Sequence, residues 1–305
     1  MAGDKPSIVF FGSGPVAANS LELLSAYCDI EAVITKPQPA HHKEAFPVLA
    51  LAERMGLKVL TPYGKKELSE LFATKPVTSK LGIVIDYGFI INQDVIDYFP
   101  LGIINSHFSI LPEWRGADPI TFAILSGQDV TGVSLMVITA GMDEGPLIAY
   151  GEHPLEGTET TPQLTESLIQ LSDALLRDEL PRYINKQITA PQSMTGREVS
   201  YSRKLTKADS ILDFTKPADQ LEREIRAYAE WPKSRTVLGD KEVIVTKAHL
   251  LPQNVSKIGT IWLGAKQFGF QTSHGILVVD ALKPAGKGEM TAEAFLAGYK
   301  HLLEQ

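Results

Sequence analysis

Short apolar runs alternate with amphipathic stretches through the first half of the chain. The runs predict strands at 7–11, 32–35, 58–60, 81–85 and 102–105, and the stretches predict helices at 16–27, 46–56, 65–73 and 117–126. Runs that are apolar at every position suit strands covered on both faces. Two further runs, at 132–138 and 147–150, extend the same sheet. We therefore expect a doubly wound, mostly parallel α/β sheet.

The second half of the chain has a different pattern. Leucines at helical spacing predict a core helix over 161–185, whereas residues 187–206 lose this periodicity and are interpreted as an interdomain linker. A helix at 218–230, short strands at 243–248, 259–263, 267–272 and 276–282, and a terminal helix at 291–303 follow. This pattern predicts a small β-barrel. We place the first domain at 1–188, the linker at 189–206 and the second domain at 207–305.

Composition and charge narrow the class of protein. The 305 residues are 44% apolar and carry a net charge of −7, which favours one or two soluble globular domains over a nucleic-acid coat or membrane-surface protein. Residues 203–305 nevertheless hold 15 basic against 12 acidic residues. The single cysteine, Cys28, excludes an internal disulfide and fits a reducing compartment. With no leader or membrane span expected, we predict a cytoplasmic protein.

A glycine-rich turn follows the first predicted strand. Gly12, Gly14 and Ala17 match the G-x-G-x-x-A pattern of dinucleotide sites, which would suit a nicotinamide-dependent oxidoreductase. No single acidic residue ends the second strand, where a ribose partner belongs. The simpler interpretation is a tight turn that needs glycines for backbone freedom.

An Asn and a His follow one another at the carboxyl end of a predicted strand. Side chains alternate along a strand, so Asn105 and His107 project from one face, where an Asn amide can donate to a developing oxyanion. This pair suits acyl transfer, although a lone His after a strand is more often structural. The glycine-bracketed loop at 139–146 could bring Asp143 to His107, or it could be an ordinary turn with solvated acids.

The next loop offers the wall of a pocket. Leu111 and Pro112 could line a site for a flat ring, and Arg115 is available for an anion or for packing loops together. The scattered histidines and the absence of H-E-x-x-H predict no metal site. Cys28 is interpreted as a small buried apolar residue.

Four motifs together resemble a known family, the 10-formyltetrahydrofolate-dependent formyltransferases. They match its core signature in order and spacing: Asn105-Ser106-His107, Ser109-Ile110-Leu111-Pro112, Trp114-Arg115-Gly116-Ala117 and Gly141-Met142-Asp143-Glu144-Gly145. A second block is similar to the junction and appended domain of the tRNA-specific branch: Lys204-Leu205-Thr206-Lys207-Ala208-Asp209, Asp213-Phe214, Ile225-Arg226-Ala227 and Trp231-Pro232. The resemblance covers the whole chain.

The resemblance implies a reaction and a set of residues. Asn105, His107 and Asp143 would be catalytic, and Ser109, Ile110, Leu111 and Pro112 would contact the folate. The co-substrate would be 10-formyltetrahydrofolate, with no metal. The acceptor would be the α-amino group of methionine on initiator methionyl-tRNA, in translation initiation. The second domain would be an OB-like, tRNA-binding barrel, and the protein a monomer.

The segment that follows the second strand departs from the family pattern. Residues 36–45 look shorter than the family's basic tRNA-binding loop and lack arginine. The candidate tRNA contacts are Lys36, Lys43, Arg203, Lys204 and Lys207. The short loop slightly favours the alternative of another amine acceptor, an amino-sugar nucleotide or a purine precursor, which the second block disfavours. Smaller departures are Asp86, Ile110 and Asp118.

Overall fold

The computed structural model describes residues 5–38, 46–255 and 257–303. These residues form two compact units. The first takes in the described residues up to Pro119, then Val130–Pro154 and Thr165–Ser202. The second takes in Ile120–Asp129, Leu155–Leu164 and the described residues from Arg203 onward. The domain limits expected from the sequence remain a prediction.

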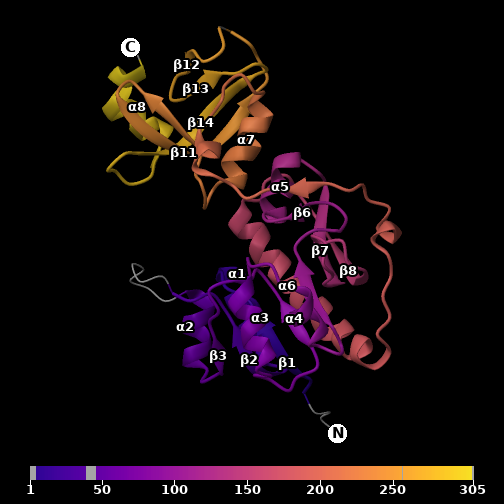
Figure 1. Cartoon of the computed structure of the whole chain (residues 1–305). Coiled ribbons are helices and arrows are strands. Elements are labelled where there is room, and N and C mark those ends of the chain that lie inside the picture. Colours follow the sequence, from indigo (N-terminus) through magenta and orange to yellow (C-terminus); the bar gives the residue numbers. More distant parts are fainter. Residues whose placement is uncertain (1–4, 39–45, 256, 304–305) are drawn as a thin grey trace. The chain divides into compact units, whose positions relative to one another are not determined.

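A sheet with the strand order β3-β2-β1-β4-β5-β7-β8 forms the centre of the first unit (Figure 1). Its strands are β1 (Ser7–Phe11), β2 (Asp29–Ile34), β3 (Val59–Leu60), β4 (Gly82–Val84), β5 (Ile103–His107), β7 (Val130–Val137) and β8 (Leu147–Pro154). The first five are parallel, whereas β7 is antiparallel to β5 and β8 to β7. The predicted doubly wound, mostly parallel sheet is therefore confirmed.

Helices follow most of these strands along the chain. They are α1 (Pro15–Ser25), α2 (Pro47–Arg54), α3 (Lys65–Ala73), α4 (Gln93–Asp97) and the long α6 (Thr161–Lys186), which the leucine spacing predicted. The sequence pattern did not predict α4, because five residues are too few to show a helical period. No helix among the described residues is both long and apolar enough to cross a membrane.

Aromatic rings pack where β1, β4 and the helices meet. The ring of Phe11, which is fully buried on β1, lies 6.0 Å from that of Phe72, 5.6 Å from that of Tyr87 and 6.0 Å from that of Phe99. Burying a side chain of this size stabilises a fold by about 2 kcal/mol. This cluster packs around β1 and β4, and β4 pairs with β5, on which the candidate site is built.

The segment after α6 packs on the first unit over residues 190–202, which we call the strap. Ala190 forms an antiparallel bridge with Leu147 on β8. At the other end, β9 (Tyr201–Ser202) pairs with β6 (Arg115–Gly116). The part of the chain expected to be an irregular linker thus makes ordered contacts as far as Ser202.

The second unit is built on an antiparallel sheet with the order β10-β11-β14-β13-β12, and β15 pairs with β14 (Figure 1). Its elements are α5 (Pro119–Ser126), α7 (Ala218–Ala227), β10 (Arg235–Leu238), β11 (Lys241–Leu251), β12 (Ile261–Leu263), β13 (Phe268–Gln271), β14 (Ile276–Pro284), β15 (Met290–Thr291) and α8 (Ala292–Tyr299). Phe268, Phe295 and Leu221 are fully buried in its core. This half-barrel confirms the expected OB-like architecture.

Candidate active site

The end of β5 presents two side chains on one face, as strand geometry requires. Ser106 points the other way, and its hydroxyl lies 2.7 Å from that of Ser172 on α6. Asn105 and His107 therefore share the opposite face, and both contact the same carboxylate, that of Asp143. The prediction that this pair projects from one side of the strand is confirmed.

The loop that carries Asp143 reaches β5 by folding back along it. Because β7 is antiparallel to β5, the loop leaves β7 opposite Ile103, where the backbone N–H of Ile138 donates to the Ile103 carbonyl at 2.8 Å. The Val137 N–H closes the loop by donating to the Pro146 carbonyl at 2.9 Å. Within it, Asp143 adopts a positive φ of 48°. This left-handed backbone conformation costs a residue other than glycine about 1 kcal/mol. Contacts with the surrounding protein must therefore stabilise the loop.

The Asp143 carboxylate joins three elements. Its Oδ2 accepts the backbone N–H of Gly116 at 2.8 Å and lies 3.8 Å from Nδ1 of His107. Its Oδ1 accepts from Nδ2 of Asn105 at 3.4 Å. The structure therefore brings together the three residues for which a catalytic role was expected. Their roles remain a prediction.

The His107 ring is oriented by a backbone group. Its Nε2 lies 3.0 Å from the carbonyl oxygen of Trp114, and since a carbonyl can only accept, Nε2 carries the hydrogen. Nδ1 is left facing Asp143, and the side chain is only 6% exposed. Sequence reasoning missed the Trp114 carbonyl and the Gly116 N–H, because any residue supplies such backbone groups.

The four residues expected to contact a folate are mostly interior. Ser109, Ile110 and Leu111 are buried, and the Ser109 hydroxyl donates to the Glu113 carbonyl at 2.5 Å. Leu111 packs in a small cluster with Met136 and Leu147. Pro112 is buried as well, so the four side chains have almost no surface to offer a ligand, and the folate contact stays a prediction.

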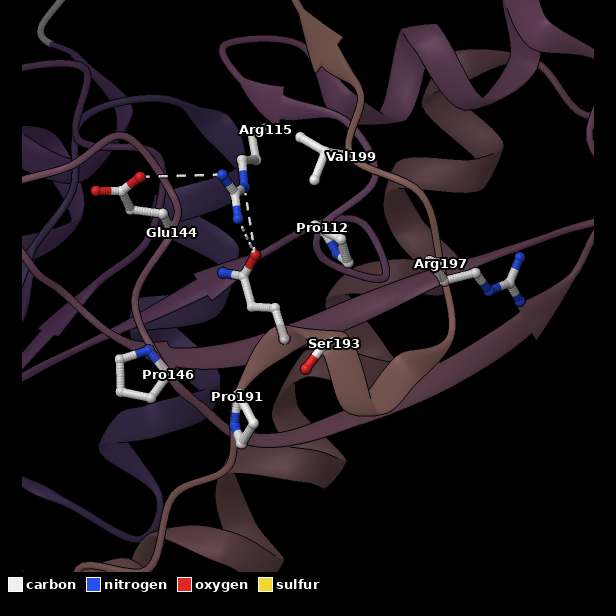
Figure 2. A pocket seen from close by; sticks show the side chains of 9 residues that line it. Pro112, Arg115, Glu144, Pro146, Pro191, Ser193, Arg197 and Val199 are labelled. Atoms are coloured by element: carbon white, nitrogen blue, oxygen red, sulfur yellow. Dashed lines mark hydrogen bonds and ion pairs between the residues drawn. The ribbon is translucent and has the colours of Figure 1, made fainter.

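Pro112 lines a pocket of about 470 Å³ (Figure 2). The other lining residues are Arg115, Glu144, Pro146, Pro191, Gln192, Ser193, Arg197 and Val199. Arg115 lies between a Glu144 oxygen at 4.0 Å and the Gln192 side-chain oxygen at 2.6 Å, as the dashed lines in Figure 2 show. Of the two expectations for Arg115, packing loops together is the one these contacts favour. Gln192 was missed because its segment was interpreted as a linker.

Two loops of the first unit carry exposed apolar side chains. Met142, next to Asp143, is 65% exposed, and Ile90, in the loop after β4, is 69% exposed. Phe89, beside Ile90, and Ile138, at the start of the loop that carries Met142, both pack against the same apolar cluster. Sequence reasoning missed these two residues, because an apolar residue in a loop does not by itself show that its side chain is exposed.

The carboxylate of Asp86 lies against Gly14, the residue that precedes α1. The Asp86 side chain lies so close to Gly14 that a Cβ there would come 2.2 Å from its Oδ2. Asp86 keeps an accessible surface. The surrounding protein nevertheless desolvates its carboxylate and raises its pKa to about 6. The positive charge of Lys36 opposes this rise, and the negative charge of Asp118 adds to it. Lys36, a candidate tRNA contact, lies with Nζ 4.8 Å from the Phe89 ring centroid. Lys43, another such candidate, is outside the described residues.

The remaining basic candidates lie in the second unit. Arg203 forms an ion pair with Asp209, whose pKa is held well below its usual range chiefly by this guanidinium. That pairing occupies Arg203, whereas Lys204 and Lys207 are exposed. As tRNA contacts, all three residues remain a prediction.

The glycine turn and Cys28 follow their simpler interpretations. A Cβ at Gly12 would lie 2.6 Å from both Ala17 and Phe10, so close packing requires this glycine. Cys28 is buried, and burial raises the pKa of its thiol to about 12. Among the described residues, no group of three or more His, Cys, Asp or Glu side chains could hold a metal ion.

Two family descriptions match almost the whole chain. Formyl transferase matches residues 8–180, and Formyl transferase, C-terminal domain, matches residues 204–300. The chain therefore belongs to the formyl transferase family.

Curated relatives carry a more particular name. The methionyl-tRNA formyltransferase of Halorhodospira halophila is 37% identical over 300 residues, which cover 95% of this chain and 96% of the relative. The methionyl-tRNA formyltransferase of Myxococcus xanthus is 34% identical over 301 residues, with coverage of 97% and 96%.

Solved structures share the fold. An N-formyltransferase from Helicobacter canadensis, in complex with folinic acid and dTDP-3-aminofucose, superposes with a TM-score of 0.68 at 19% identity, covering 90% of this chain and 98% of its own. The phosphoribosylglycinamide formyltransferase of Bacillus halodurans gives a TM-score of 0.51 at 22% identity, covering 60% and 97%.

Proposed function

We propose that this protein transfers the formyl group of 10-formyltetrahydrofolate to the α-amino group of methionine on initiator methionyl-tRNA. The observation that carries the proposal is the convergence of Asn105, His107 and Asp143 at one point of a formyl transferase fold. The acceptor is proposed from the two relatives described above, which share at least 34% identity over nearly the full chain and are named for methionyl-tRNA.

In the proposed formyl transfer, Asn105, His107 and Asp143 have different roles. When the amine attacks the formyl carbon, negative charge develops on the formyl oxygen, and the amide of Asn105 is placed to donate to it. His107 is held between the Trp114 carbonyl and Asp143, which fixes the orientation of its ring beside the other two candidates. The amine must lose a proton and N10 of the folate must gain one as the C–N10 bond breaks. Asp143, whose side chain is 18% exposed, is the group proposed to relay that proton.

The donor is proposed on the apolar surface beside Asp143. The exposed side chains of Ile90 and Met142 offer flat apolar contact of the kind that a pterin ring needs. The neighbouring Asp143 and Asn105 would then meet the formyl group carried by that ring system.

The deciding experiment follows labelled formyl from 10-formyltetrahydrofolate to charged initiator tRNA with the purified protein. Charged elongator tRNA and an Asp143→Ala variant run alongside. We expect formylation that prefers the initiator and falls by about 10²- to 10⁴-fold in the variant. Transfer that does not depend on Asp143 would contradict the assigned site.

A second acceptor belongs in the same assay. Solved structures of this fold include an N-formyltransferase in complex with dTDP-3-aminofucose and a protein named for phosphoribosylglycinamide. An amino-sugar nucleotide and a purine-precursor amine are therefore tested with the same donor. Transfer to either of them, with none to tRNA, would replace the proposed acceptor and keep the catalytic group.

A further inference from the structure

One side chain of the strap is built into the catalytic loop. Gln192 is buried, with 7% of its surface exposed. Its Nε2 donates to the carbonyl of Asp143 at 2.7 Å and to that of Gly145 at 2.9 Å. Its Oε1 accepts from Arg115, at 2.6 Å from Nη2 and 3.2 Å from Nε. Both N–H groups and both lone pairs of the amide are thus used.

These four contacts position the Asp143 carboxylate in two ways. Directly, Gln192 holds the Asp143 carbonyl and so the backbone that adopts φ of 48°. Indirectly, it holds Arg115, whose neighbour Gly116 donates its N–H to Oδ2 of Asp143 at 2.8 Å. Removal of the amide would therefore release both the loop that carries Asp143 and the donor that orients its carboxylate.

The strap keeps Gln192 in place from both ends. Before it, Ala190 and Leu147 exchange backbone hydrogen bonds at 2.7 and 2.8 Å. After it, the Thr195 hydroxyl donates to the Leu111 carbonyl at 3.0 Å, and the Ser200 N–H donates to the Pro112 carbonyl at 3.2 Å. Because the strap is anchored at both ends, the side chain of Gln192 is held in the position that its hydrogen bonds require.

We propose that Gln192 is a positioning residue for formyl transfer, acting through Asp143. The inference rests on the proposed function for its kinetic test and on the loop contacts for its structural test. It assigns a positioning role to the strap, which contacts the backbone of Asp143 through Gln192.

Two substitutions distinguish the role of the N–H donors of Gln192 from that of its side-chain oxygen. Gln192→Leu removes both donors and both acceptors at similar volume. Gln192→Glu keeps an oxygen for Arg115 but sets a carboxylate against the carbonyls of Asp143 and Gly145, to which it cannot donate. Ser193→Ala, at the next position of the strap and in the same pocket, is the matched control.

Kinetics with 10-formyltetrahydrofolate and methionyl-tRNA give the first test. We expect both Gln192 variants to lower kcat by about 10- to 100-fold, with KM for each substrate within about threefold of the unsubstituted value, because a loop misplaced by about 1 Å costs this much. Ser193→Ala should leave kcat unchanged. An unchanged kcat in Gln192→Glu would overturn the proposal, and this variant decides the point if Gln192→Leu does not fold.

A double-mutant cycle with Asp143→Asn separates positioning from general structural damage. If Gln192 acts through Asp143, Gln192→Leu should lower the residual kcat of the Asp143→Asn protein by less than about twofold. An equal decrease in both backgrounds would show that Gln192 acts elsewhere.

Hydrogen exchange gives a readout that needs no activity. Amides of residues 138–146 should exchange faster in Gln192→Glu than in Ser193→Ala, with the other strands of the sheet unchanged. Unchanged exchange in this loop would overturn the inference. An unsubstituted protein that formylates no tRNA would overturn the proposed function alone, because the exchange comparison would still decide the role of Gln192.

Discussion

The carboxylate of Asp86 fills the space in which a side chain at Gly14 would lie. A Cβ at position 14 would come 2.2 Å from Oδ2 of Asp86, closer than any real contact. The φ of Gly14 is −84°, which any residue adopts, so the glycine is required by its neighbour and not by its backbone. The two residues, 72 positions apart, therefore constrain each other.

This constraint predicts a paired mutational effect. Gly14→Ala should lower the free energy of unfolding by about 1–2 kcal/mol, because Asp86 must move to admit the methyl group. The effect should shrink when Asp86→Ala is added, since that substitution removes the clashing oxygens. Urea unfolding of the two single variants and the double variant measures the coupling. Additive effects would show that the contact does not limit the site.

The raised pKa of Asp86 predicts a dependence of stability on pH. Its pKa rises from an ordinary value of 3.8 to about 6 because the surrounding protein desolvates the carboxylate and, secondarily, Asp118 disfavours its charged form. A folded-state pKa above the unfolded value means that the folded state binds the proton more tightly. The stabilisation by this group is thus full below about pH 4 and is lost as pH rises through about 6.

The matching variant is Asp86→Asn, which removes this titration. We expect it to flatten the change in the free energy of unfolding between about pH 4 and about pH 7, measured by urea denaturation across that range. Lys36→Met should displace the same transition upward in pH, because Lys36 lowers the pKa of Asp86. A profile unaffected by Asp86→Asn would assign the pH dependence to other groups.

His107→Ala should separate turnover from binding. The ring faces Asp143, and under the proposed function its removal should lower kcat by about 10²-fold or more while the affinity for the folate changes little. Steady-state kinetics and a direct folate titration measure the two quantities. Equal decreases in both would identify His107 as a binding residue only.

The exposed lysines at the start of the second unit predict salt-dependent RNA binding. Replacing Lys204 and Lys207 with alanine should weaken tRNA binding and lower the slope of log K against log salt by about 0.7–0.9 for each phosphate that is no longer neutralised. Transfer at saturating tRNA should be nearly unchanged. Lys80→Ala, an exposed lysine of the first unit, is the control. An unchanged slope would show that Lys204 and Lys207 do not contact the tRNA phosphates.

The parts of the fold that depend on local pattern could be predicted from the sequence. The run at 7–11 is β1, and the period-two alternation that puts Asn105 and His107 on one face holds in β5. These predictions succeed because backbone geometry alone sets them. The two-residue β15 and the four-residue β10 escaped prediction because so short a run shows no period.

The rest of the candidate site depends on contacts that no local pattern encodes. Gln192 meets Asp143 across 49 positions, from a segment without hydrophobic periodicity. The Trp114 carbonyl and the Gly116 N–H act through the backbone, which every residue possesses. The folate contact that the family resemblance implies for Ile110 and Leu111 stays a prediction, and both side chains are buried.

The strap also sets the moment at which the site is complete during synthesis. The central sheet is finished once β8 has emerged from the ribosome, at Pro154, but Gln192 and the strand that pairs with Arg115–Gly116 follow only by Ser202. A nascent chain stopped at residue 188 therefore carries Asn105, His107 and Asp143 without the groups that hold their loops together. The strands of the sheet are therefore complete in sequence before the strap, which supplies the contact of Gln192 with the loop that carries Asp143.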